Sequence, residues 1–241
     1  MQKKVFALDL DGTLTEHRTW ISDENIAALD ELKDAGLRLV IVGAGQIRRI
    51  FAQLRKYPIE ILGNYGLQYA VYREEKGDLE YIRDMSLPCD RESITARING
   101  LRHSLGYEEY VGDTVEIHPS GCVTFPLLGT KALIQDKLTF DSDRSKRRAI
   151  YADVAAAFPE YSVFVGGSSS FDMVPEPYNK YYAVEDFCKV NGFDISETTY
   201  FGDDYGMGGN DEPVYNSAID FVKVDKPVNF PNIVRDYLKT L

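Results

Sequence analysis

The sequence Leu8-Asp9-Leu10-Asp11-Gly12-Thr13-Leu14-Thr15 follows directly on the apolar run Val5-Phe6-Ala7. Side chains alternate along a strand with a period of two, so Asp9 and Asp11 are expected on one face at the end of a buried strand. Gly12 allows a sharp turn and a close approach of the backbone to a ligand. Two carboxylates beside such a loop are suited to a divalent cation and a phosphate.

The overall composition limits the class of partner. The chain has 241 residues, of which 44% are hydrophobic, and a net charge of −11. This is ordinary for a globular protein with a real core. An acidic balance argues against nucleic acid or an anionic membrane as a partner, because both need a basic face. A small phosphorylated substrate is still compatible, provided that a metal and a few local Lys or Arg residues supply positive charge.

The three cysteines, Cys89, Cys122 and Cys188, have no paired spacing. They predict neither a disulfide framework nor a zinc site, and they are typical of a protein in a reducing cytoplasm. The apolar stretch near the N-terminus is too short for a signal peptide, and Asp9 interrupts it. No stretch approaches the roughly 18 apolar residues of a membrane span.

Strands and helices alternate over the first part of the chain. This alternation predicts a doubly wound, Rossmann-like α/β fold with a parallel sheet. The predicted elements are strands at Val5–Leu8, Leu37–Val42 and Ile59–Leu62, a helix capped by Ser22 and ended by Gly36, and a helix at Gln46–Lys56.

The rhythm then changes to antiparallel strands and two helices, and the α/β pattern resumes near Lys180. We therefore predict an inserted α+β cap domain at 86–174 within a discontinuous core domain at 1–85 and 175–241. The predicted cap elements are helices at Arg91–Leu105 and Arg144–Phe158 and strands at Thr114–Ile117, Val123–Leu127, Tyr161–Val165 and Ser170–Val174.

A second acidic loop follows the predicted strand Thr199–Phe201. Loops from neighbouring strands of a doubly wound sheet meet at one edge, so Asp203 is expected to join Asp9 around one Mg²⁺. The alternative is a solvated acidic turn, and the presence of two such loops favours the metal site. The remaining polar residues of this loop, expected to support the site from behind, are Asp204, Asn210 and Asp211.

Lys180 begins the predicted helix that follows the cap. A lysine at the start of a helix is normally solvated. Here it could instead be the point charge that pairs with Asp9 and with phosphate. The sequence alone does not decide between these two interpretations.

These segments together resemble the haloacid dehalogenase (HAD) superfamily of Mg²⁺-dependent phosphotransferases. Residues 9–15 match its first motif, Lys180 its third, and 202–211 its fourth, while the insert resembles a large α/β cap. The match is closest to eukaryotic-type phosphomannomutases. The stretches that carry this closer resemblance are Asn64-Tyr65-Gly66-Leu67, Gly166 to Pro175, and Gly208-Gly209-Asn210-Asp211.

The resemblance implies covalent catalysis. Asp9 would be the nucleophile that forms an aspartyl-phosphate, and Asp11 the general acid and base. Mg²⁺ would be held by Asp9, the backbone carbonyl of Asp11, and Asp203. Lys180 would hold the phosphate.

The second motif departs from the family pattern. The loop Val42-Gly43-Ala44-Gly45-Gln46 lacks the expected Ser or Thr hydroxyl. Its backbone N–H groups could still bind phosphate. The residues predicted to contact phosphate or substrate are Gly12, Thr13, Arg18, Ala44, Gly45 and Asp172.

The cap departs further. The resemblance implies cap arginines that bind a second phosphate, but Val111, His118 and Thr130 occupy the matching positions. Lys131 or Arg102 could substitute, although neither aligns, and His118 is either a weaker anion ligand or simply exposed. The basic residues Arg144, Lys146, Arg147 and Arg148 are interpreted as a solvated helix face.

The missing cap arginines favour a Mg²⁺-dependent phosphatase acting on a small phosphorylated metabolite, such as a sugar phosphate. The alternatives are a phosphomannomutase with a rebuilt cap site, which interconverts mannose 1-phosphate and mannose 6-phosphate, and a catalytically silent phosphosugar-binding protein. The resemblance also implies a homodimer formed through the cap.

Overall fold

The computed structural model describes residues 2–17 and 19–240. They form two compact units. The core unit comprises Met1–Met85, Asn179–Tyr205 and Asp211–Leu241, and the cap unit comprises Ser86–Tyr178 and Gly206–Asn210. None of the helices in the described part of the chain combines the length and the apolar character that crossing a membrane requires.

Two short segments that the sequence analysis assigned to the core, 175–178 and 206–210, belong to the cap unit. The Glu176 N–H donates to the Glu160 carbonyl at 3.0 Å, which continues the pairing of the neighbouring cap strands. The Val165 N–H donates to the Gly208 carbonyl at 2.8 Å. Backbone hydrogen bonds to cap residues therefore place these two segments in the cap unit. The sequence pattern does not reveal such bonds, because the partners are distant along the chain.

A seven-stranded sheet forms the centre of the core unit, in the order β11-β10-β1-β2-β3-β4-β5. The five strands from β11 to β3 are parallel, whereas β4 and β5 are antiparallel. The strands are β1 (Val5–Leu8), β2 (Arg38–Val42), β3 (Glu60–Gly63), β4 (Gln68–Arg73), β5 (Asp78–Asp84), β10 (Thr198–Gly202) and β11 (Asp220–Lys223).

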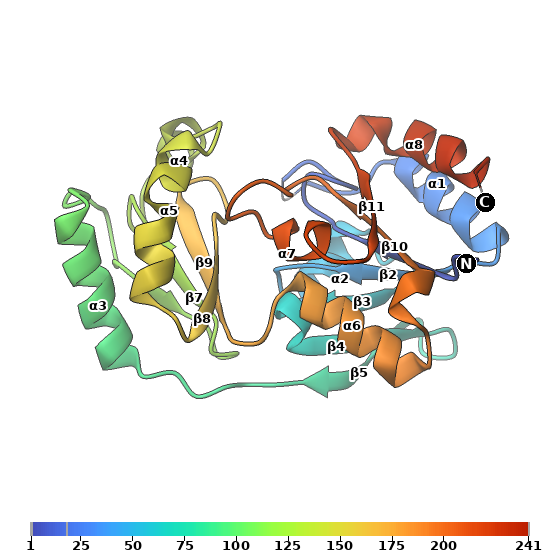
Figure 1. Ribbon diagram of the computed structural model, residues 1–241, viewed down its shortest axis with the longest axis horizontal. Helices are drawn as coiled ribbons and strands as arrows, with labels where there is room; N and C mark the ends of the chain where they lie inside the picture. Colours follow the sequence, from blue (N-terminus) through green and yellow to red (C-terminus); the bar gives the residue numbers. More distant parts are fainter. Residues whose placement is uncertain (1, 18, 241) are drawn as a thin grey trace. The chain divides into compact units, whose positions relative to one another are not determined.

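Helices cover both faces of this sheet, which confirms the doubly wound fold (Figure 1). Along β1, Phe6 and Leu8 pack with α1 (Asp23–Asp34), α2 (Ile47–Gln53) and α8 (Phe230–Leu238). Val5 and Ala7 point to the other face, toward α6 (Lys180–Asn191) and α7 (Glu212–Tyr215). The period-two alternation of a fully buried strand thus serves two apolar cores. Short 3₁₀ helices lie at Asn64–Gly66, Ile195–Glu197 and Pro227–Asn229.

Local signals set the ends of the first two helices. The Ser22 side chain accepts a hydrogen bond from the Asn25 N–H, which is the predicted cap of α1. Gly36 follows its end with a φ of +79°. Helix α2 ends at Gln53, before the predicted Lys56. The reason is that both Arg55 and Lys56 adopt positive φ angles, which interrupt a right-handed helix.

The cap unit contains an antiparallel sheet in the order β6-β7-β9-β8. Its predicted first strand shrinks to two residues, and the sequence does not predict α4, which buries no residue. The cap elements are β6 (Glu116–Ile117), β7 (Val123–Pro126), β8 (Tyr161–Phe164), β9 (Ser170–Pro175), α3 (Arg91–Ser104), α4 (Ile134–Phe140) and α5 (Ser145–Ala157).

One face of the cap sheet is apolar and the other is polar. Phe125 and Phe171 belong to a buried cluster that includes residues of α3 and α5. Their strand neighbours Thr124 and Asp172 are paired in register and are only partly buried. Because strand side chains alternate, Thr124 and Asp172 share the face opposite the helices.

The interpretation of the basic run as a solvated face is wrong for Arg147, which is 1% exposed. Its Nε donates to Asp141 Oδ2 at 2.7 Å, and its Nη1 donates to the carbonyls of Gly166 at 2.6 Å and Ser170 at 3.1 Å. Burial opposes ionisation of Asp141, but hydrogen bonds from Arg147 and from backbone N–H groups hold its pKa below the usual value. This buried ion pair anchors the loop that precedes Asp172.

Replacing Asp141 with Ala is expected to destabilise the cap unit by about 3–5 kcal/mol, because it leaves a buried guanidinium without its counter-ion. Asp153→Ala is the matched control, since Asp153 is an exposed carboxylate on α5. It should change stability by less than about 0.5 kcal/mol. Urea unfolding measures both variants, and equal stabilities would contradict the assignment.

Candidate active site

Asp9 lies directly after β1 and is 4% exposed. Lys180, the first residue of α6, is fully buried, and its Nζ donates to Asp9 Oδ1 at 2.5 Å. The same Nζ donates to Asp211 Oδ1 at 2.7 Å. Of the two interpretations left open for Lys180, the solvated one is therefore excluded.

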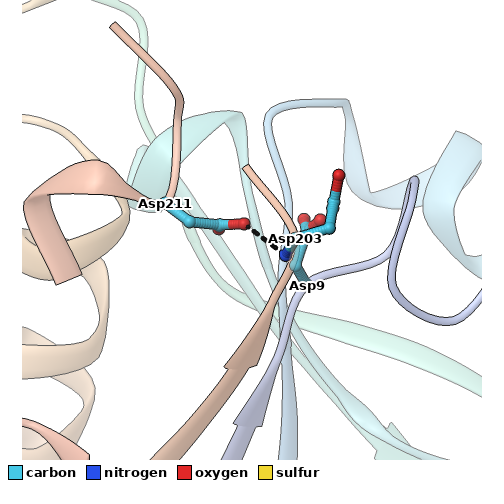
Figure 2. Close-up of side chains that lie close together, drawn as sticks. All are labelled: Asp9, Asp203 and Asp211. Carbon is cyan, nitrogen blue, oxygen red and sulfur yellow. Dashed lines mark hydrogen bonds between the residues drawn. The ribbon is translucent and has the colours of Figure 1, made fainter. Parts of the chain in front are cut away.

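Asp211 accepts four hydrogen bonds and fixes the loop after β10. Its Oδ1 accepts from Lys180 and, at 2.7 Å, from the hydroxyl of Tyr200. Its Oδ2 accepts from the backbone N–H groups of Asp203 at 3.1 Å and Asp204 at 3.0 Å. Figure 2 shows the bond between Asp211 and the Asp203 backbone. Because both oxygens are occupied by two donors each, Asp211 acts as an anchor rather than as a free ligand.

The Asp203 side chain lies next to the first loop. The Thr13 hydroxyl is 3.2 Å from Asp203 Oδ1 and 3.4 Å from Asp9 Oδ2. Gly12 has a φ of +103°, and a Cβ on it would overlap the Asp203 carboxylate. Glycine is therefore required here for both its conformation and its size. Ligand atoms of Asp9, Asp203 and Asp211 all lie within 4.8 Å of one another, which makes this acidic cluster a candidate cation site.

The cluster holds more negative than positive charge. Burial raises the pKa of Asp9 well above its usual value, opposed by Lys180 and reinforced by Asp211 and Asp203. Burial, followed by the charge of Asp211, raises the pKa of Asp203 to about 6. Burial would lower the pKa of Lys180, but the charges of Asp211 and Asp9 outweigh it and raise that pKa, so the ammonium stays protonated. A divalent cation beside Asp9 and Asp203 would balance this excess.

Asp11 has different partners from Asp9. Gln53 Nε2 donates to Asp11 Oδ1 at 2.6 Å, and Arg49 Nη1 donates to Asp11 Oδ2 at 3.2 Å. Both partners come from α2. The two carboxylates of the first motif therefore lie in distinct networks, one joined to Lys180 and the other to α2.

The second loop, residues 43–45, follows β2 at the carboxyl edge of the parallel sheet. It is fixed by backbone bonds, since the Asn64 N–H donates to the Gly45 carbonyl at 2.9 Å and the Tyr65 N–H donates to the Gly43 carbonyl at 3.2 Å. Ala44 and Gly45 are partly exposed. The loop has the position expected of a phosphate-binding backbone, although it carries no hydroxyl.

The other predicted site residues are divided between the two units. Asp204 is buried in the core unit, where its carbonyl accepts from the Asp211 N–H at 3.0 Å. Asn210 and Asp172 belong to the cap unit. Arg18 lies outside the residues that the structure describes. Asp9, Asp203 and Lys180 therefore lie together in the core unit, whereas the predicted contacts Asn210 and Asp172 belong to the other unit.

The polar face of the cap sheet carries a short chain of hydrogen-bonding side chains. His118 Nε2 lies 3.1 Å from Thr124 Oγ1, which donates to Asp172 Oδ1 at 3.3 Å. Arg102 is not a replacement for a cap arginine, because it is buried and its guanidinium donates to the carbonyls of Tyr107 and Leu127 at 2.8 and 2.7 Å.

Three residues of the core site were missed by the sequence analysis: Tyr200, Arg49 and Gln53. Tyr200 lies inside a fully buried strand, where a tyrosine suggests only packing. Arg49 and Gln53 are four residues apart on the helix that follows the hydroxyl-free loop. Residues at that spacing share one helix face, so this pair was a usable signal.

The fold and the acidic cluster define a HAD-type phosphotransferase, and comparisons with known proteins agree. A family model described as haloacid dehalogenase-like hydrolase matches residues 6–76. A second model, described as eukaryotic phosphomannomutase, matches residues 119–240. The chain belongs to the eukaryotic phosphomannomutase family within the HAD superfamily, and it is an enzyme.

Curated relatives extend this similarity over most of the chain. A phosphomannomutase of Schizosaccharomyces pombe is 25% identical over 88% of this chain and 85% of its own length. A phosphomannomutase of Galdieria sulphuraria is 28% identical over 87% of this chain and 84% of its own length.

Solved structures share the fold. The IMP-bound IMP-nucleotidase of Plasmodium falciparum, in an N-terminally truncated form, aligns with a TM-score of 0.64 at 13% identity, covering 99% of this chain and 68% of that one. A HAD subclass IIB sugar phosphatase aligns with a TM-score of 0.60 at 16% identity, covering 92% of this chain and 87% of that one.

Replacing Lys180 with Met is expected to destabilise the core unit by about 3–5 kcal/mol, because Asp9 and Asp211 lose their shared cation while both stay buried. Lys189→Met on the same helix is the matched control. Lys189 makes an exposed pair with Glu185, at 2.8 Å, and its loss should cost less than about 1 kcal/mol. Urea unfolding compares the two variants, and a Lys180 variant as stable as the control would refute the buried-anchor role.

Proposed function

We propose that this enzyme is a Mg²⁺-dependent phosphatase for a small, hydroxyl-rich phosphate monoester such as a sugar phosphate, acting through an aspartyl-phosphate on Asp9. The observation that carries the proposal is the setting of Asp9. Its carboxylate is buried at the end of β1, oriented by the Lys180 ammonium at 2.5 Å, and adjacent to the acidic loop of Asp203. Phosphoryl transfer needs a fixed nucleophile, with a lysine and a divalent cation beside it to offset the negative charge of the phosphate.

In the first step, an Asp9 carboxylate oxygen attacks phosphorus and the bond from phosphorus to the substrate oxygen breaks. Asp11 donates its proton to that leaving oxygen, which departs as an alcohol. The products are the aspartyl-phosphate and the ionised Asp11. Lys180 keeps Asp9 in place and offsets negative charge, in accord with its raised pKa.

In the second step, the Asp11 carboxylate removes a proton from water as the water oxygen attacks phosphorus. The bond between phosphorus and Asp9 breaks, which regenerates the Asp9 carboxylate and the protonated Asp11 and releases inorganic phosphate. The net reaction consumes one ester and one water. If a sugar hydroxyl replaced water, the same chemistry would make a mutase.

The donor set fits a hard divalent cation. Among the described residues, the Thr13 hydroxyl is the hydrogen-bond donor at Asp9 Oδ2 and Asp203 Oδ1, at 3.4 and 3.2 Å, whereas Asp211 is occupied by its four hydrogen bonds. Oxygen ligands of this kind are the ones that Mg²⁺ prefers. When bound, Mg²⁺ would neutralise charge on the transferred phosphoryl group. We assign Asp9, Asp203 and the Asp11 backbone carbonyl as its protein ligands.

The polar side chains of the cap favour a substrate that carries a single phosphate. Its polar sheet face presents His118, Thr124 and the Asp172 carboxylate. A carboxylate accepts hydrogen bonds from sugar hydroxyls and repels a second phosphate. Val111 and Thr130 have uncharged side chains, and the Thr130 hydroxyl lies 3.4 Å from Asp113, so this part of the cap adds no positive charge at those two positions.

Phosphomannomutase activity is the second candidate. It is favoured by the family match over residues 119–240 and by the names of the curated relatives. A mutase must bind either end of a bisphosphate in turn, and Val111 and Thr130 supply no cation for the second phosphate at the positions where the resemblance implies arginines. We also propose a cytoplasmic location, which the free thiols of the three cysteines support. A homodimer formed through the cap remains a prediction.

Incubation with Mg²⁺ and a panel of sugar phosphates is expected to release inorganic phosphate. Asp9→Asn should abolish the release, because an amide cannot form the aspartyl-phosphate. Asp225→Asn, which changes an exposed carboxylate after β11, should be unaffected. Conversion of mannose 1-phosphate to mannose 6-phosphate without net phosphate release would instead establish the mutase.

Mg²⁺ is expected to raise the melting temperature of the wild-type protein by about 5–10 °C at a hundredfold excess over Kd, because it binds only the folded state. Asp203→Asn should lose this shift, whereas Asp225→Asn should keep it. Differential scanning calorimetry with and without a chelator measures the effect. A shift that survives in Asp203→Asn would show that the cation binds elsewhere.

A further inference from the structure

Arg49 and Gln53 form a connected pair on the face of α2 that meets Asp11. Arg49 Nη1 donates to Gln53 Oε1 at 2.9 Å and to Asp11 Oδ2 at 3.2 Å. The Arg49 side chain is 39% exposed, so the guanidinium is accessible while held by two acceptors. The pair therefore contacts Asp11, the proposed general acid and base, through Nη1 of Arg49. The other guanidinium nitrogens remain available to a ligand.

Gln53 fixes the geometry of this arrangement. It is 5% exposed, and its Nε2 donates to Asp11 Oδ1 at 2.6 Å and to Thr15 Oγ1 at 2.8 Å. Because its Oε1 accepts from Arg49, the two ends of the amide cannot exchange without losing bonds. Gln53 therefore orients Asp11 and Arg49 together.

The other side of the Arg49 guanidinium covers Gly45. A Cβ built on Gly45 would overlap Nη2, Cζ and Nε of Arg49. Gly45 does not have a positive φ angle, so the backbone does not require glycine there. The guanidinium instead fills the space that a side chain at position 45 would take. Within the described residues, both hydrogen bonds of the guanidinium run through Nη1, and Nε and Nη2 of Arg49 have no acceptor.

We propose that Arg49 is the side chain that binds the transferred phosphoryl group at the second loop, filling the space beside Gly45 and supplying the hydrogen-bond donor that the missing hydroxyl of this loop would give. The assignment rests on the phosphoryl-transfer function proposed above. It makes Arg49 a catalytic residue and Gln53 the positioning residue that holds Arg49 and Asp11 in register.

Charge and geometry favour this role. The acidic cluster of Asp9, Asp203 and Asp211 gathers three carboxylates, and the Lys180 ammonium pairs with Asp9 and Asp211. A phosphoryl group adds more negative charge at the same edge of the sheet. A guanidinium has a permanent charge and donors spaced for two phosphate oxygens, so it can supply more than a single hydroxyl would.

The test is calorimetric titration of inorganic phosphate into the Mg²⁺-containing protein, which reports binding without turnover. Arg49→Ala should weaken phosphate binding about 10- to 150-fold, the range for losing a hydrogen bond to a charged group. Arg49→Lys should bind more tightly than Arg49→Ala. Arg48→Ala is the matched control, because Arg48 is the adjacent arginine and pairs with the exposed Asp78; it should stay within about twofold of wild type.

The double variant Arg49→Ala with Gly45→Ser distinguishes direct phosphate binding by Arg49 from a purely structural role. Removing Arg49 opens the space for a serine, and the restored hydroxyl should recover part of the lost phosphate affinity, about tenfold. A purely structural role for Arg49 would give no such recovery. Unchanged binding by Arg49→Ala, or no recovery in the double variant, would overturn the assignment.

The same titration separates this assignment from the proposed function. Phosphate binding that depends on Arg49, in a protein that hydrolyses no ester of the panel, would refute the phosphatase and leave the role of Arg49 standing. Ester hydrolysis with phosphate binding that is independent of Arg49 would do the reverse. Circular dichroism of each variant checks that it is folded.

Discussion

A single buried ammonium organises the core site. Lys180 is 0% exposed and joins Asp9 at the end of β1 to Asp211 in the loop after β10, while the residue itself begins α6. The Lys180 ammonium thus ties the end of β1 and the loop after β10 to the start of α6. Asp211 passes this constraint on through its bonds to the Asp203 backbone and to the Tyr200 hydroxyl. A buried pair of this kind is costly unless every lone pair is satisfied, and here all those of Asp211 are.

The two carboxylates of the first motif differ because their surroundings differ. Asp9 shares the ammonium of Lys180, whereas Asp11 is held by the neutral amide of Gln53 and by the partly exposed Arg49. Carboxylates placed in unlike environments can take unlike roles, one as nucleophile and the other as acid and base. Separate networks also let Asp11 exchange protons without disturbing the anchor of Asp9.

Much of this site follows from sequence. Asp9 and Asp203 end buried strands that are neighbours in a parallel sheet, so their meeting is a consequence of strand order. The rest depends on packing across long sequence separations. The burial of Arg147, for example, was missed because charge at a helix start normally means solvent, and only Asp141 and a distant loop reverse that. A glutamine considered alone gives no indication of the role of Gln53; only its spacing of four residues from Arg49 does.

The central claim is that Asp9 carries the phosphoryl group. Rapid quench of the enzyme with a ³²P-labelled sugar phosphate and Mg²⁺, followed by peptide mapping, tests it directly. We expect an acid-stable, base-labile label on the peptide that contains Asp9, and no label in the Asp9→Asn variant. Label on a different residue, or phosphate release by Asp9→Asn at the wild-type rate, would contradict it.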